Sequence, residues 1–334
     1  MYSLFPDSKS LKMFFNLSQA ESFDVYFRGE KAYFVCNTDE VFALLKMDCI
    51  KTASEGDAMT HLPKAPFQKL AGDGSLLFSL TDNQVEVSFL RETNEIFCRT
   101  VFNRQEVNDI SYSEKMEIAL DTSVVATKKF KVEDLGVLPK LVGALGGVLR
   151  VGGETASIIT PYNCRVYKKL GEPAPFACSM NAKQIGAIAK VSSYFYGYHQ
   201  FLVAKNKQLV ILARQMRNLQ DVELDDLLAD KSYYSSQVHL HNVFQFMSNM
   251  KFDQTSLELD VQKRECVFTS NSCTYKVPYI INGENRPEGC KFQKYSFPAP
   301  FFNAVLKILP GTTFTLEQHA NFVLMIQNDY VVEG

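Results

Sequence analysis

The chain has 334 residues, of which 46% are hydrophobic, and it contains 26 Phe and 15 Tyr. That content is enough to bury the cores of two or three domains without disulfide or metal staples. The formal net charge is -2 and the pI is about 6.2, so the overall charge does not indicate binding to nucleic acids or membranes. Any positive surface for DNA must therefore be local.

The start of the chain and the cysteines indicate the cellular compartment. Asp7, Lys9 and Lys12 interrupt the apolar residues at the N-terminus, a pattern that does not fit a secretory signal. The eight cysteines include no CxxC pair. No run approaches the ~20 apolar residues that a membrane-spanning helix needs. We therefore expect a cytoplasmic protein with reduced thiols.

Six segments show the helical periodicity of apolar residues. In the first, Leu11 and Phe14 lie on one face, and Asp7 or Ser8 can cap the N-terminus. The third contains Pro139, which predicts a break or a late start. The six predicted helices span Ser8 to Ala20, Pro63 to Ala71, Val132 to Leu145, Asn181 to Ser193, Leu240 to Met250 and Pro300 to Leu309.

Each predicted helix is followed by a pair of short strands joined by a tight turn. These pairs lie at 23–36, 75–90, 148–160, 201–213, 256–270 and 313–327. One helix with two strands cannot bury its own apolar face, so the recurrence indicates a repeat of pattern. Dividing 334 residues by six gives about 56 per unit.

Other segments complete the chain between these units. Alternation predicts additional strands at Glu40 to Cys49, Glu95 to Phe102 and Lys115 to Val125. We expect polar connectors at Arg104 to Asp109 and Asp221 to Asp230, and a tail at Asn328 to Gly334 with the ordinary alternative of a frayed terminus.

Carboxylates are unevenly distributed along the chain. All six predicted helices lie in windows without Asp or Glu, apart from Glu133 and Asp134 in the first turn of the third, where they suit a helix N-terminus. Helices with uncharged or lysine-bearing faces suggest a common surface near phosphates, although ordinary solvated faces are the alternative. The candidate lysines are Lys9, Lys12, Lys64, Lys69, Lys140, Lys183, Lys190, Lys251 and Lys307.

The order of the repeats, the length of the unit and the placement of charge resemble those of DNA sliding clamps. The resemblance covers nearly the whole chain and has no diagnostic short motif. It implies an α+β fold of three clamp domains at 1–110, 111–230 and 231–334, with helices lining a ring interior and antiparallel sheets outside. Three domains per chain are similar to bacterial β clamps, whose rings contain two subunits, and the compact units suggest a phage-encoded member.

The resemblance also implies partners. A clamp encircles duplex DNA without reading its sequence and tethers a DNA polymerase, and its loader and polymerase bind through short peptides. Transfer by unit position expects a pocket for these peptides beside the C-terminal tail. Its residues would be Thr160, Tyr162, Arg165, Val166, Tyr330, Val331 and Val332, for which an ordinary strand end is the alternative.

No residue pattern points to catalysis, a metal or a cofactor. His239 and His241 alternate on one strand, but no Cys, Asp or Glu completes a site at usable spacing. The glycine-rich run at 143–154 lacks the Lys-Ser/Thr of a phosphate loop and is interpreted as turn glycines. We therefore expect a protein that is not an enzyme.

Two other interpretations stay open at this point. The first is a monomeric, open processivity subunit of the herpesvirus kind, which holds DNA by a basic face. The second is a β-rich viral interaction protein without a DNA role.

Overall fold

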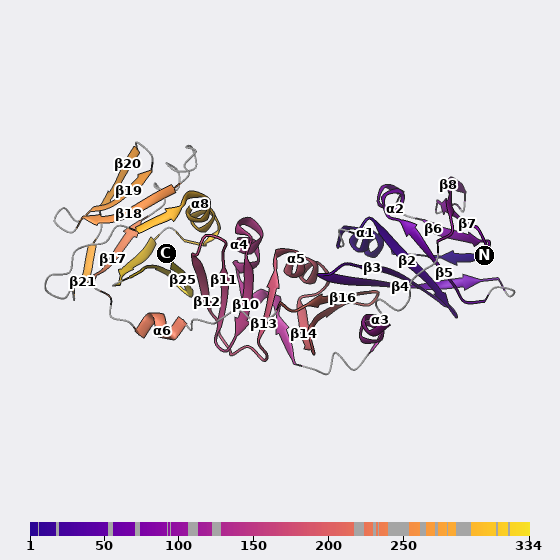
Figure 1. The fold of residues 1–334 in the computed structure, drawn as a ribbon, viewed down its shortest axis with the longest axis horizontal. Helices are drawn as coiled ribbons and strands as arrows, with labels where there is room; N and C mark the ends of the chain where they lie inside the picture. Colours follow the sequence, from indigo (N-terminus) through magenta and orange to yellow (C-terminus); the bar gives the residue numbers. More distant parts are fainter. Residues whose placement is uncertain are drawn as a thin grey trace. The chain divides into compact units, whose positions relative to one another are not determined.

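The computed structural model describes residues 1–5, 7–17, 20–52, 56–70, 74–91, 93, 95–105, 113–121, 128–216, 224–229, 232, 234–239, 254–260, 265–270, 273–278, 280–284, 295–311, 313–319 and 321–334. They form two compact units, Met1–Lys131 with Gly186–Gln215, and Val132–Ile185 with Met216–Gly334. Each unit consists of antiparallel strands with helices packed against them (Figure 1). The predicted α+β class is confirmed.

One branched sheet of twelve strands forms the first unit. Its strands are β1 (Tyr2–Leu4), β2 (Ser22–Arg28), β3 (Lys31–Asn37), β4 (Val41–Lys51), β5 (Ala58–Pro63), β6 (Ser75–Leu80), β7 (Gln84–Leu90), β8 (Ile96–Asn103), β9 (Lys129–Lys131), β14 (Tyr194–Tyr198), β15 (Phe201–Lys205) and β16 (Leu209–Arg214). The main path runs β8-β7-β6-β1-β4-β16-β15-β14-β9, and β5-β2-β3 branches from β4.

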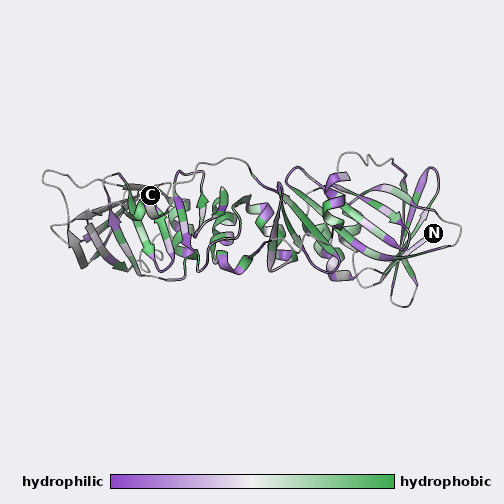
Figure 2. Ribbon diagram, turned by 90° about the horizontal axis from the view of Figure 1, so that it is seen from below, coloured by the Kyte–Doolittle hydropathy of each residue, from purple (hydrophilic) through white to green (hydrophobic). Residues whose placement is uncertain are grey.

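Phenylalanines hold the helices of this unit on the sheet. The helices are α1 (Ser8–Leu17), α2 (Ala65–Leu70), α3 (Ser113–Leu120) and the second half of α5 (Ala182–Val191). The ring of Phe23 on β2 lies 5.2 Å from Phe15 of α1 and 4.9 Å from Phe67 of α2, centroid to centroid. All three rings are buried. Figure 2 shows hydrophobic and hydrophilic residues interspersed along the strands and helices.

The cap of α1 follows the sequence. The backbone N–H of Ser10 donates to the Asp7 carboxylate at 3.1 Å, and the Ser10 hydroxyl donates to it at 2.7 Å. The hydrogen bond from the Ser10 side chain is the main cause that lowers the pKa of Asp7. Asp7 is therefore the N-terminal cap.

Two sheets form the second unit. The nine-stranded sheet has the order β13-β10-β11-β12-β25-β24-β23-β17-β21, and the four-stranded sheet has the order β20-β19-β18-β22. The strands are β10 (Val148–Gly152), β11 (Thr155–Ile159), β12 (Arg165–Lys169), β13 (Cys178–Asn181), β17 (Tyr234–His239), β18 (Gln254–Asp260), β19 (Glu265–Ser270), β20 (Cys273–Pro278), β21 (Ile280–Glu284), β22 (Tyr295–Pro298), β23 (Thr313–Gln318), β24 (Val323–Gln327) and β25 (Tyr330–Glu333). The helices are η3 (Val132–Leu135), α4 (Leu138–Leu145), α6 (Leu224–Ala229) and α8 (Ala299–Ile308).

Strand pairing repeats three times along the chain. The first half of each repeat is a row of four strands, β5-β2-β3-β4, then β13-β10-β11-β12, then β22-β18-β19-β20. The second half is another row, β1-β6-β7-β8, then β9-β14-β15-β16, then β17-β23-β24-β25. Successive repeats are joined by β4 with β16 and by β12 with β25. All six predicted strand pairs are present as hairpins.

Five predicted helices lie in the described residues and are present. The third begins as η3 and resumes as α4 after Gly136, so the break expected from Pro139 is confirmed. The predicted helix at 240–250 lies outside the described residues. So do the predicted domain boundaries at 110 and 230, and the three-domain division stays a prediction.

Two expectations about the remaining segments were wrong. The predicted strand Lys115 to Val125 begins as the helix α3, because Met116, Ile118 and Ala119 pack on β4, β15 and β16. The tail at 328–334 contains β25, which pairs on both sides, and is therefore not a frayed terminus. The segment predicted as an acidic connector, 221–230, contains the short helix α6, in which Leu224 and Leu227 are buried and Leu228 is 41% exposed.

Candidate functional site

The junction of β12 and β25 brings most of the predicted pocket residues together. Arg165 lies opposite Glu333, and Val166 lies opposite Val332. Val331 lies opposite Tyr167 on the same two strands. This pairing joins segments that are 166 residues apart in the chain.

The loop before β12 carries the rest of the predicted pocket. The Thr160 hydroxyl donates to the backbone oxygen of Cys164 at 2.7 Å, and the Tyr162 N–H donates to the Thr160 hydroxyl at 3.3 Å. Thr160 is buried, whereas Tyr162 is 37% exposed. The loop therefore presents Tyr162 and uses Thr160 to fix its backbone.

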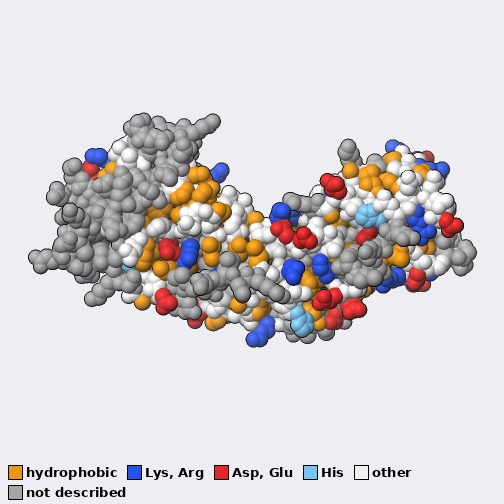
Figure 3. Space-filling view, viewed as in Figure 1, with side chains coloured by type: hydrophobic (Ala, Val, Ile, Leu, Met, Phe, Trp, Pro, Cys, Tyr) orange, Lys and Arg blue, Asp and Glu red, His pale blue; other side chains and the backbone are white. Residues whose placement is uncertain are grey.

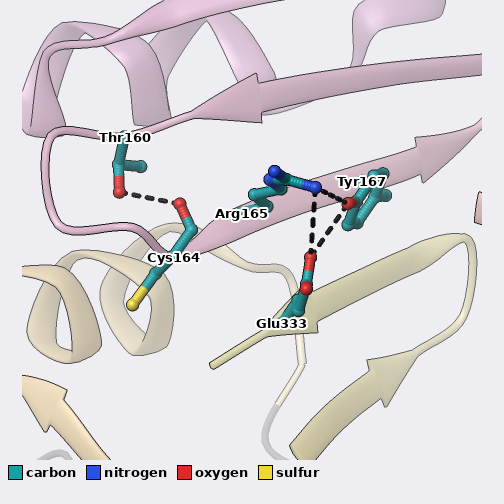
Figure 4. Close-up of polar contacts among 5 residues, drawn as sticks. All are labelled: Thr160, Cys164, Arg165, Tyr167 and Glu333. Carbon is teal, nitrogen blue, oxygen red and sulfur yellow. Dashed lines mark hydrogen bonds and ion pairs between the residues drawn. The ribbon is translucent and has the colours of Figure 1, made fainter. Parts of the chain in front are cut away.

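Polar side chains connect the two strands on one face of the junction (Figure 4). The Tyr167 hydroxyl donates to Glu333 Oε2 at 2.9 Å, and Arg165 Nη1 donates to the Tyr167 hydroxyl at 3.4 Å. Arg165 Nη1 and Glu333 Oε2 form an ion pair at 3.9 Å. Burial raises the pKa of Tyr167 to about 12, so the phenol stays a neutral donor.

A buried apolar cluster lies next to the ion pair on this face, and its Leu324 is opposite Glu333 in the strand register. Tyr167 and Val331 pack with Leu324 of β24 and with Leu224 and Leu227 of α6. Tyr167, Glu333 and the leucines of α6 were not among the predicted pocket residues. Alternation along 165–167 was the one available signal for Tyr167, and no local pattern indicated the others.

Tyr330 anchors the opposite face of β25. Its hydroxyl accepts a hydrogen bond from the backbone N–H of Val137 at 3.1 Å, immediately before α4. Gly136 has φ +57°, and a Cβ there would lie 2.1 Å from the Tyr330 hydroxyl. The Lys168 ammonium lies 5.9 Å from the centre of the Tyr330 ring. Tyr330, Val166, Val331 and Val332 are themselves buried, so they support the junction from within.

The predicted DNA-facing lysines are mostly exposed. Exposed side chains are found at Lys9, Lys12, Lys140, Lys183, Lys190 and Lys307. Lys64 is an exception, because it is only 6% exposed and its burial lowers the pKa of its ammonium group. Its backbone N–H donates to Glu21, which holds it at the start of α2. The Lys69 side chain and Lys251 lie outside the description.

On the face shown in Figure 3, basic and acidic side chains of the described residues are interspersed, so charge of one sign is not concentrated there. Within the described part of the chain, no cluster of three His, Cys, Asp or Glu residues has the geometry of a metal site. No described helix is long and apolar enough to cross a membrane.

Comparison with known proteins gives one consistent result. No protein-family model and no curated protein sequence matches the chain. A protein assigned as the DNA polymerase III beta subunit of Eubacterium rectale matches with a TM-score of 0.74 at 9% identity, over 100% of this chain and 98% of that chain. The DNA polymerase III beta subunit of Pseudomonas aeruginosa matches with a TM-score of 0.70 at 11% identity, over 100% and 99%. The Helicobacter pylori β clamp bound to a DNA ligase peptide matches with a TM-score of 0.67 at 11% identity, over 100% and 99%.

The chain has the β-clamp fold. In this β-clamp fold, β8 pairs only with β7 and β20 only with β19 among the described strands, whereas the corresponding strands β16 and β25, and β4 and β12, pair on both sides. On β8, Ile96, Phe97 and Val101 are 46%, 43% and 52% exposed. These fractions are high for large apolar side chains on a sheet edge, which indicates a surface that another strand can cover.

Proposed function

We propose that this protein is a sliding clamp, a ring of two copies that encircles duplex DNA and tethers a DNA polymerase. The observation that carries the proposal is the threefold strand pairing, together with a match that spans the full length of solved β clamps. Tethering raises the local concentration of the polymerase at its template, so the clamp itself needs no catalytic residue.

The way that repeats join inside the chain supports closure of the ring. At both internal junctions, the strand that ends the first half of one repeat pairs antiparallel with the strand that ends the second half of the following repeat. These pairs are β4 with β16 and β12 with β25. The first half of the third repeat ends in β20, and the second half of the first repeat ends in β8. The same rule pairs β20 of one copy with β8 of a second copy. Two such contacts close a homodimer.

The helices supply the contacts to DNA. The six exposed lysines are borne by α1, α4, α5 and α8, the helices that line the hole in clamps. Ammonium groups on flexible stems bind phosphates without fixing a register, so the protein can slide. Lys69 and Lys251 belong to the same proposal, and Lys64 does not because it is buried.

The junction of β12 and β25 is the proposed site for partner peptides. The H. pylori protein with this fold was solved with a DNA ligase peptide bound. Here the partly exposed Phe322 and Ile326, which pack against the buried cluster of α6, β12 and β24, would contact apolar side chains of the polymerase and clamp-loader peptides, together with exposed Tyr162. A protein with these partners works in the cytoplasm of a bacterial or phage-infected cell.

Light scattering at low micromolar concentration tests the ring. The chain mass is 37.8 kDa, and we expect a species of twice that mass. The dimer, loaded on nicked circular DNA, should stay bound in high salt and be released when the circle is cut. A persistent monomer that binds circular and linear DNA equally would contradict the ring and favour the open subunit. Absence of DNA association even with a cognate loader would favour an interaction protein without a DNA role.

A further inference from the structure

We propose that Arg165 and Glu333 form an ion pair with no net charge at the junction of β12 and β25. Because the two charges compensate each other, the charge of a partner peptide has little effect on its affinity for this junction. The inference rests on the proposed function of this junction as a peptide site. It predicts that partners are chosen by their apolar side chains, and that peptides with acidic or basic residues near the pair bind about equally well.

The geometry holds the two charges together. Arg165 and Glu333 are opposite each other in the strand register, and their charged groups are 3.9 Å apart. Tyr167, two residues along the same face, donates its hydroxyl to Glu333 and accepts from Arg165 (Figure 4). The phenol therefore bridges the pair and limits how far either side chain can turn away.

The position of the pair puts it within reach of a bound peptide. Tyr167 belongs both to the polar triad and to the apolar cluster with Val331 and α6. Side-chain exposure is 29% for Arg165 and 21% for Glu333, so both charges lie at the rim of the cluster and meet solvent. Phe322 and Ile326 pack against the cluster and are partly exposed. A peptide lying on them would place a charge near both members of the pair, and the effects of the two members on that charge would nearly cancel.

Neutralising one member of the pair should leave the charge of the other member uncompensated. Glu333→Gln leaves Arg165 without a countercharge and should shift preference toward acidic peptides. Arg165→Gln leaves Glu333 and should shift preference toward basic peptides. For a partly exposed pair we expect each shift to be about two- to fivefold in the ratio of dissociation constants. The shifts should shrink as salt rises, because rim charges are screened.

The probe is the DNA ligase peptide from the H. pylori complex, in versions with Glu, Gln or Lys at each position in turn. Binding to the full-length protein is measured by fluorescence anisotropy for the natural chain, each single variant and the double variant. We expect shifts of opposite sign in the single variants and a return to the natural ratio in the double variant. Glu154→Gln, on an exposed turn of the same unit, controls for the change in net charge.

The outcomes separate this inference from the proposed function. Peptide binding without opposite shifts would overturn the neutral pair and leave the peptide site intact. No binding by any peptide version would overturn both the site and the inference. Thermal unfolding of each variant is measured in parallel. If both single variants unfold while the double variant folds, the pair is needed for structure alone and the inference is wrong.

Discussion

At the residue scale, Gly136 and Tyr330 show how one missing side chain lets two distant segments meet. Gly136 has φ +57°, which L side chains rarely adopt, and its open side is filled by the Tyr330 hydroxyl. That hydroxyl accepts from Val137 in front of α4. The contact fixes the helix that bears Lys140 to the C-terminal strand.

Gly136→Ala should therefore destabilise the protein by about 2 kcal/mol, from backbone strain and from the clash with Tyr330. Urea unfolding followed by circular dichroism measures the change. In the double variant with Tyr330→Phe the clash with the hydroxyl is gone and only the end of the flexible Lys168 side chain, whose Cε would lie 2.9 Å away, must shift, so the loss should be smaller than the sum of the two single losses. Gly143→Ala is the matched control, because a Cβ there meets nothing within 4 Å. It should be neutral or stabilising by up to about 1 kcal/mol. Strict additivity of Gly136→Ala and Tyr330→Phe would contradict the proposed clash.

At the element scale, the open strand β8 differs from the corresponding strands β16 and β25. Those two strands pair on both sides, and their apolar residues are covered by α3 or α6. The strand β8 pairs on one side, and its Phe97 and Val101 remain about half exposed. An edge of this kind can pair with a strand of a second chain.

If the proposed dimer forms through β8, Phe97→Lys with Val101→Lys should convert it to monomers. Burying a Phe or Val side chain contributes about 1.5–3 kcal/mol, so we expect the dimer to weaken at least tenfold. Light scattering across a concentration series measures the effect. Ile50→Lys is the control, because Ile50 is 64% exposed but lies on β4, away from the open edge. Equal weakening by the control would argue against β8 as the interface.

At the scale of the whole molecule, the net charge of -2 conceals the distribution that matters. Exposed lysines on the helices can attract phosphates while carboxylates elsewhere keep the total near neutral. The relevant measurement is therefore the salt dependence of DNA binding and not the pI.

Replacing the six exposed helix lysines with Gln should weaken binding to a short duplex and flatten its salt dependence. Each lost phosphate contact lowers the slope of log K against log salt by about 0.9. Fluorescence anisotropy at several salt concentrations measures the slope. Lys46, Lys207 and Lys276 are exposed on strands or turns, and their replacement is the control. A larger effect from the control set would place the DNA surface on the sheets.

Local patterns determined much of this fold. The apolar periodicity located α1, α2, α4, α5 and α8, the alternation and turns located all six hairpins, and Asp7 and Pro139 marked where α1 and α4 begin. Each of these features depends on residues within a few positions of one another, so sequence spacing is sufficient to show it.

Only the tertiary structure decided which distant segments meet. The stretch after Ser113 alternates like a strand, yet burial on β4 and β16 makes it a helix. The C-terminal residues became a central strand because β12 and β24 flank them. The contact of Tyr167 with Glu333 crosses 166 positions, and Lys64 became buried by its neighbours. Register between remote strands and burial depend on packing of the whole chain, which local periodicity does not encode.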